Sequence, residues 1–215
     1  MPSGARASTP VTCSHSNLGD VGQLSFFSAQ IDRPAYDDLA GLLAAHGQAV
    51  RSDSGTRVSV VVDELWRARA LVEEIAETGA AAEIATSEEG SPIARTAHSH
   101  ELDELHRRWS SGAVKAMPKG WVPSPRALRL WAIAAGEPDG DRYLLGLDAH
   151  APDTHAVLAT ALMRVGIAPT LVGTRGHSPS LRIAGKRRLT HLLEYVGEPP
   201  AQPGAHAHWP MVPGF

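Results

Sequence analysis

The sequence lacks several features that define whole classes of proteins. Of its 215 residues one is cysteine, Cys13, which excludes a framework of disulfide bonds. No apolar run approaches the roughly 18 residues of a membrane-spanning helix, and the N-terminus lacks the cationic and apolar regions of a signal peptide. No phosphate-binding loop or nucleophile-elbow motif is present. We therefore expect a cytoplasmic protein with no small-molecule cofactor and no membrane partner.

Net charge is also nearly absent. The formal charge is −3, which argues against a protein that coats nucleic acid by bulk positive charge. The balance hides an uneven distribution, because residues 1–108 carry 9 basic and 16 acidic side chains whereas residues 109–215 carry 11 and 7. Any binding to DNA is expected to be local and one-sided.

The sequence contains an internal repeat. Residues 55–63 (GTRVSVVVD) align without a gap with residues 140–148 (GDRYLLGLD), an offset of 85, and matches at offsets of 87 and 89 lie on either side. The small changes in offset fall where loops are expected, and loops tolerate insertions. The chain is therefore predicted to hold two copies of a unit of about 87 residues.

Each copy follows the same order of elements. Apolar residues at helical spacing alternate with segments of two-residue period and turn residues. The predicted helices cover 36–45, 64–78 and 99–109 in the first copy and 125–135, 152–165 and 186–196 in the second. Hairpins are expected between them, at 48–62 and 138–149 and around the turns EEGSP and RGHSP. This order predicts an α+β fold of two αββαββα repeats.

The predicted boundaries follow from composition. The first repeat covers 25–109, a linker 110–124 and the second repeat 125–199, while 1–24 and 200–215 are predicted to be disordered tails rich in small residues and proline. We expect the linker, with Lys115 and Lys119, to be a plain connection. The tryptophans at helical or linker positions are expected to pack the core and the join between copies; they are Trp66, Trp109, Trp121 and Trp131.

The string LAGLLAAHG at residues 39–47, within this repeat, resembles the motif of LAGLIDADG homing endonucleases. In the second copy, residues 128–136 (LRLWAIAAG) keep only the helical apolar pattern and the final glycine. The chain is also similar to the LAGLIDADG-type N-terminal domain of WhiA-type sporulation regulators, which keeps the fold without nuclease activity. The resemblance implies that the two first helices pack together about a pseudo-two-fold axis, and that two antiparallel sheets form a saddle that contacts DNA.

The same resemblance implies an acid before the final glycine of each motif, which would hold a divalent metal for phosphodiester hydrolysis. The matching residues here are His46 and Ala135, and neither offers a carboxylate to Mg²⁺. The acids nearby are expected at a helix N-terminus or in a turn, where they are common; they are Asp37, Asp38, Glu137 and Asp139. We therefore predict no catalytic residue and no metal ligand. The scattered histidines, among them His155 on an expected solvent face, show no zinc-site spacing.

Candidate DNA contacts lie opposite the predicted buried strand residues and at the start of the last helix. Guanidinium groups make bidentate bonds to phosphate and to guanine. The candidates are Arg57, Arg95, Arg142, Arg175, Arg182, Lys186, Arg187 and Arg188. The alternative for the strand arginines is that each pairs with a neighbouring carboxylate and protects the sheet from association.

The leading hypothesis is a catalytically inactive, LAGLIDADG-like protein of a bacterial cytoplasm that binds double-stranded DNA or acts as a regulatory factor associated with transcription. After residue 199 there is no room for a helix-turn-helix domain, which weakens sequence-specific recognition. The alternative is a protein-interaction module that docks onto a partner such as the transcription machinery. The third hypothesis is a divergent homing-type endonuclease.

Overall fold

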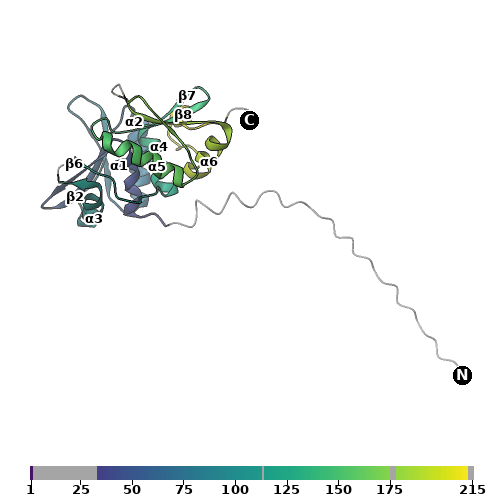
Figure 1. Cartoon of the computed structure of the whole chain (residues 1–215). Helices are drawn as coiled ribbons and strands as arrows, with labels where there is room; N and C mark the ends of the chain where they lie inside the picture. The colour runs from purple at the N-terminus through teal and green to yellow at the C-terminus, as the bar shows by residue number, and fades with distance from the viewer. Residues whose placement is uncertain (2–32, 113, 175–177, 213–215) are drawn as a thin grey trace.

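The computed structural model describes Met1 and residues 33–112, 114–174 and 178–212. The predicted N-terminal tail at 1–24 therefore lies, apart from Met1, outside the described residues. The two copies lie side by side, the first coloured purple to teal and the second green to yellow, with α1 and α4 between them (Figure 1). The predicted α+β fold of two αββαββα repeats is confirmed.

The first copy contains three helices and four strands in the predicted order. A 3₁₀ turn at Tyr36–Leu39 leads into α1 (Ala40–Ala44), and another at His100–Leu102 leads into α3. The remaining elements are β1 (Gln48–Ser52), β2 (Gly55–Val61), α2 (Leu65–Glu77), β3 (Ala82–Thr86), β4 (Pro92–Thr96) and α3 (Asp103–Trp109).

The second copy repeats this order. Its first helix, α4, begins at Pro125, directly after Ser124, whose Oγ accepts a hydrogen bond from the Ala127 amide at 3.0 Å and so caps the helix. The elements are α4 (Pro125–Ala135), β7 (Gly136–Asp139), β8 (Arg142–Gly146), α5 (His155–Arg164, after a 3₁₀ turn), β9 (Thr170–Val172), β10 (Ser180–Ala184) and α6 (Lys186–Val196).

Each copy builds one antiparallel sheet of four strands with the same topology. The strand order is β1-β2-β4-β3 in the first sheet and β7-β8-β10-β9 in the second. Because side chains alternate between the faces of a strand, Val58 and Val60 are buried against the helices, as are Tyr143 and Leu145 at the equivalent places of the second sheet. The opposite faces of both sheets point away from the helices.

The first helices of the two copies touch backbone to backbone. A Cβ placed on Gly41 of α1 would lie 1.9 Å from the carbonyl oxygen of Ala127 in α4, so only glycine fits at this crossing. The predicted close packing of the two helices is confirmed. The four tryptophans expected in the core are all less than a tenth exposed, at 0 to 8%.

The expected tail at 200–215 is wrong for residues 200–212. Ala205, in a 3₁₀ turn at Ala205–His208, is fully buried, and Trp209 is 2% exposed. The Trp209 indole N–H donates to the Gly197 carbonyl at 2.7 Å, and the guanidinium of Arg129 lies 5.3 Å from its ring centre. Composition suggested mobility, but one buried aromatic residue with a bonded N–H anchors this segment to the second copy.

The stretch 110–124 is likewise more than a connection. It contains a short hairpin of β5 (Ser110–Ser111) and β6 (Val114–Lys115), and the Lys115 side chain is 9% exposed. Trp121 packs edge-on against Trp109, with ring centres 5.1 Å apart. None of the helices among the described residues is long and apolar enough to cross a membrane.

Candidate nucleic-acid interface

The strand arginines point outward, as the alternation predicts. Arg57 and Arg95 lie on the outer face of the first sheet, and Arg142 and Arg182 lie at the repeat-equivalent places of the second. On each outer face the register pairs the β4 or β10 arginine with a residue of the neighbouring edge strand. That neighbour differs between the copies, and the difference decides whether the arginine of β4 or β10 is paired with a carboxylate.

In the first sheet the charge of Arg95 is neutralised. Arg95 stands opposite Glu83 of β3, and its Nε and Nη2 atoms lie 2.9 and 2.8 Å from Glu83 Oε1. In the second sheet Arg182 stands opposite Thr170 of β9, the repeat equivalent of Glu83 at an offset of 87. Within the described part of the chain, Arg182 has no hydrogen-bond or ion-pair partner. The alternative of a paired surface arginine therefore holds for Arg95 and fails for Arg182.

Arg57 and Arg142, the other repeat-equivalent arginines, make no strong ion pair with any described residue. The Nε of Arg57 is buried and makes no hydrogen bond to any described residue. Arg142 is 45% exposed, and its Nε lies 3.5 Å from the carboxylate of its neighbour Asp141, which is 75% exposed. Contacts of this kind between exposed charges are weak, so the Arg142 guanidinium can exchange its neighbour for a phosphate.

Further positive charge lies at the start of α6. Lys186, Arg187 and Arg188 are exposed and line a cavity of about 850 Å³ together with Gly185 and His191. The Nη1 of Arg188 donates to the Ala184 carbonyl at the end of β10, at 3.2 Å. Arg175, which was also a candidate DNA contact, lies outside the described residues. The structure thus brings Lys186, Arg187 and Arg188 to the end of the strand that carries Arg182.

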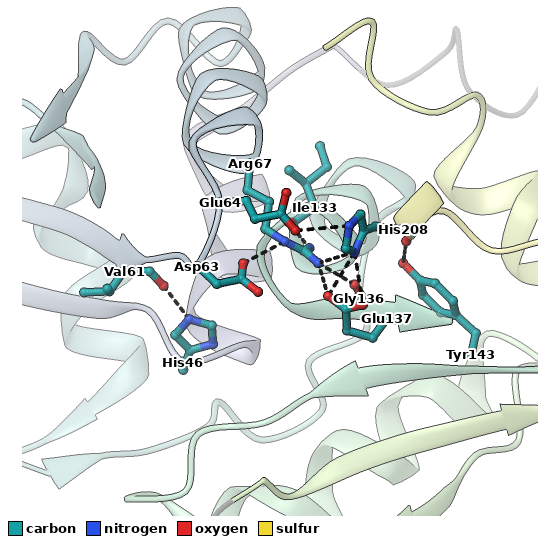
Figure 2. A network of polar contacts seen from close by, with 10 residues as sticks. All are labelled: His46, Val61, Asp63, Glu64, Arg67, Ile133, Gly136, Glu137, Tyr143 and His208. Carbon is teal, nitrogen blue, oxygen red and sulfur yellow. Dashed lines mark hydrogen bonds and ion pairs between the residues drawn. The ribbon is translucent and has the colours of Figure 1, made fainter. Parts of the chain in front are cut away.

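The two positions where the resemblance implies metal-binding acids lie at the ends of α1 and α4. His46 is hydrogen-bonded through Nε2 to the Val61 carbonyl at 2.6 Å (Figure 2), and Ala135 is the last residue of α4. Asp38, as expected near a helix N-terminus, accepts from the Ala35 amide and from Ser124 Oγ, at 2.9 and 2.6 Å. No cluster of three histidine, cysteine or acidic side chains suited to a metal exists in the described ranges.

The end of α1 instead holds a lysine. Lys115 Nζ donates to the carbonyls of Ala45 and Gly47 and to Asp148 Oδ2, each at 3.0 Å. Asp148 follows β8 of the second copy, is 3% exposed, and also accepts from Gln48 Nε2 at 3.0 Å. Burial lowers the pKa of Lys115, opposed by the carboxylate. For Asp148 burial acts to raise the pKa, but the Lys115 charge and the hydrogen bonds outweigh it and the pKa is lowered.

The end of α4 holds an arginine in a corresponding way (Figure 2). Arg67 of α2, 1% exposed, donates to the carbonyls of Ile133 and Gly136 at 2.8 and 3.0 Å. Its guanidinium also pairs with Glu137 and, at 3.0 Å, with Asp63 Oδ1. Glu137 was expected in a turn; it is the second residue of β7.

The C-terminal segment closes this arginine site. His208 lies between two carboxylates, with Nε2 3.1 Å from Glu64 and Nδ1 3.1 Å from Glu137, and its ring centre is 5.4 Å from that of Trp66. Its carbonyl accepts from the Tyr143 hydroxyl at 3.1 Å (Figure 2). The expectation that His155 lies on a solvent face is wrong. Its side chain is 4% exposed, and the buried ring is satisfied by a hydrogen bond between Nε2 and the Asp148 carbonyl at 2.7 Å.

A divalent metal does not fit at the end of α1 or of α4 while Lys115 and Arg67 occupy these places. The carbonyl and carboxylate oxygens that would ligate it already accept hydrogen bonds from Lys115 or Arg67. Neither Lys115 nor Arg67 was a candidate site residue in the sequence. The available signal was the pair Asp63 and Asp148, which match across the repeat and both meet a buried cation.

The fold defined by these two packed copies is LAGLIDADG-like, and comparison with solved structures agrees. The homing endonuclease I-WcaI bound to its DNA recognition sequence is similar with a TM-score of 0.55 at 11% identity, over 84% of this chain and 89% of that one. The N-terminal LAGLIDADG domain of DUF199/WhiA is similar with a TM-score of 0.51 at 15% identity, over 76% of this chain and 82% of that one.

Full-length DUF199/WhiA from Thermotoga maritima gives a TM-score of 0.54 at 15% identity. That match covers 75% of this chain and 54% of the longer protein, so the present chain spans about half of full-length WhiA. No protein-family profile and no curated protein matches the sequence. At these identities the comparisons establish the shared fold.

Proposed function

We propose that this chain binds double-stranded DNA with the outer face of its second sheet, without cleaving it, as a regulatory protein associated with transcription in a bacterial cytoplasm. The observation that carries the proposal is the outward Arg182, which faces Thr170 where its counterpart Arg95 faces Glu83. A β-surface with outward arginines suits contacts to phosphates and base edges in a groove.

The charge distribution supports the same face. Residues 109–215 carry four more basic than acidic side chains, whereas residues 1–108 carry seven more acidic than basic ones. The exposed Lys186, Arg187 and Arg188 at the start of α6 add positive charge beside β10. The fold is shared with a homing endonuclease that was solved bound to DNA. Binding through the second copy alone explains why the first can remain acidic.

The proposal that the chain does not cleave DNA rests on donor chemistry. His46 and Ala135 occupy the places of the two acids, and the nearby carboxylates of Asp148 and Asp63 are engaged by Lys115 and Arg67. The regulatory role is proposed from the resemblance of the sequence to WhiA-type regulators, whose N-terminal domain has a similar fold. A duplex library of random sites incubated with Mg²⁺ or Mn²⁺ is expected to remain intact, and metal-dependent cleavage would support a divergent nuclease instead.

The direct test of binding is retardation of duplex DNA at low salt, repeated as salt rises. Affinity is expected to fall steeply, because cations that neutralise phosphates release counterions from the duplex. No retardation at low salt would contradict the proposal.

A second candidate function has its own observation. The outer face of the first sheet is charge-neutralised at Arg95 and exposes Val50 and Val61, which are 58 and 45% accessible. A face of this kind suits a protein partner of the transcription machinery. Affinity capture from native lysate separates the two functions: a complex that survives nuclease treatment supports a protein partner, whereas recovery of DNA-dependent species alone counts against it.

A further inference from the structure

The ends of α1 and α4 have similar surroundings, although the basic side chains that lie there, Lys115 and Arg67, are not equivalent in the repeat. Asp148 and Asp63 are equivalent in the repeat, at an offset of 85, and Gln48 and Glu137 are equivalent at an offset of 89. The contacts cross the junction in different ways: Asp148 of the second copy meets Lys115 at the end of α1, whereas Asp63 pairs with Arg67 of its own copy and Arg67 reaches across to the end of α4.

The two cations come from different elements. Lys115 belongs to β6, after the third helix of the first copy, whereas Arg67 lies in α2. An offset of 87 from Arg67 leads to Thr154, which is not basic. Positive charge is thus present at both ends although the residues that supply it are not repeated. The shared feature is the set of acceptors, two backbone carbonyls and a carboxylate at each end, which belongs to Asp148 beside Lys115 and to Glu137 beside Arg67.

We propose that these two helix ends are cation sites of the fold that are filled permanently by the chain's own Lys115 and Arg67, so that the junction is stable without a divalent metal. Lys115 shows the fit most clearly. An ammonium group has three N–H donors, and here each has an acceptor at 3.0 Å. The acceptors are carbonyl and carboxylate oxygens, the donor type that Ca²⁺ and Mn²⁺ prefer.

The proposal predicts a gain of metal binding when the lysine is shortened. In Lys115→Ala the carbonyls of Ala45 and Gly47 and the carboxylate of Asp148 lose their common donor and surround a space of suitable charge. The melting temperature of this variant in EDTA is expected to fall below that of the wild type. Added Ca²⁺ or Mn²⁺ is expected to raise it again by several degrees, whereas the wild-type value does not respond.

Two controls isolate the site. Lys119→Ala removes an exposed lysine four residues away and is expected to behave as the wild type in both conditions. Lys115→Ala combined with Asp148→Asn keeps the space but removes its charge, and is expected to lose the response to metal. A folded Lys115→Ala variant that binds neither ion, measured by melting and by titration calorimetry, would overturn the proposal.

The wild type provides a test that does not depend on the variant folding. Added Mn²⁺ broadens NMR signals of nearby nuclei, and in the wild type the Gln48 side-chain amide is expected to stay sharp. Broadening that disappears in Asp148→Asn would show a metal bound beside Lys115 and would overturn the proposal. None of these measurements involves DNA, so their failure and the failure of DNA binding are distinguishable.

Discussion

Arg95 and Arg182 occupy equivalent places in the two sheets, yet Arg95 is paired to Glu83 at 2.8 Å while Arg182 faces a threonine. Duplication alone would have made the two outer faces equal. A single difference on the neighbouring edge strand pairs Arg95 with a carboxylate and leaves its counterpart Arg182 without one. The proposed one-sided DNA interface therefore rests on the position of Glu83, which has threonine as its repeat equivalent in the second sheet.

Exchanging the two edge-strand residues tests this relationship. Thr170→Glu places a carboxylate opposite Arg182, and we expect affinity for duplex DNA to fall several-fold. Glu83→Thr frees Arg95, and we expect affinity to rise. Each contact to a phosphate contributes about 0.9 to the slope of log affinity against log salt, so the slope should become shallower by about that amount in the first variant. Fluorescence anisotropy over a salt series measures both.

These substitutions lie on the outer face at β-edge positions, so the fold should be retained. Circular dichroism and melting temperature serve as the check. Equal effects of Thr170→Glu and of a glutamate placed at exposed Thr160 of α5 would mean that overall charge, and not the Arg182 face, governs binding.

The docked C-terminal segment predicts a large loss of stability in Trp209→Ala. Truncating a buried tryptophan typically costs about 3–5 kcal/mol, and here the hydrogen bond to Gly197 and the contact with Arg129 are lost as well. Met211→Ala is the matched control, because Met211 is 59% exposed, and it should change the free energy of unfolding by less than about 0.5 kcal/mol. Urea denaturation compares the two; similar values would show that 200–212 does not anchor the fold.

The helix crossing predicts that Gly41→Ala is destabilising. In a free helix alanine is favoured over glycine by about 1 kcal/mol. At Gly41 the added carbon meets the Ala127 carbonyl, and backbone yields little, so overpacking of about 1–3 kcal/mol should outweigh the gain. Thr160→Ala on the exposed face of α5 raises helix propensity without such a contact and should be neutral or stabilising. A stabilised Gly41→Ala would contradict the close packing of α1 on α4.

The Lys115–Asp148 pair predicts part of the acid sensitivity. The folded pKa of Asp148 lies below its ordinary value of 3.8, so below that pH the unfolded chain takes up a proton that the folded chain does not. Stability is therefore lost as pH falls from the ordinary value through the folded pKa, by at most about 1.4 kcal/mol per pH unit for one proton. Asp148→Asn should lose stability less steeply over this window, while exposed Asp153→Asn should follow the wild type.

The fold was predictable because its signals are local and occur twice. The predicted helices at 125–135 and 186–196 match α4 and α6 residue for residue, since the apolar residues at helical spacing from which they were predicted are the ones that the helices bury. The outward direction of Arg57, Arg95, Arg142 and Arg182 followed from the two-residue period of the strands. Repetition at offsets of 85 to 89 then gave the order of elements in both copies, whereas the packing of the two first helices was expected from the resemblance to LAGLIDADG proteins.

The charge partners were not predictable. Whether Arg95 meets Glu83 depends on which strands are neighbours and in what register, which the periodicity of one strand does not specify. Lys115 and Arg67 reach the helix ends through contacts across 33 and 70 residues of sequence, with Asp148 and Glu137. The C-terminal segment was misjudged because its composition is rich in proline, glycine and alanine, whereas contacts of Trp209, His208 and Ala205 with distant parts of the chain determine where it docks.

The outer face of the second sheet, and not that of the first, is proposed to bind DNA. The most direct measurement is the affinity for one duplex over a salt series of two double variants, Arg142→Ala with Arg182→Ala and Arg57→Ala with Arg95→Ala, which remove equivalent pairs from the two sheets. We expect the first to lose affinity and to flatten the salt slope by about 1 for each phosphate contact removed, and the second to stay near the wild type. Equal losses in both variants, or a loss only in the second, would contradict the account.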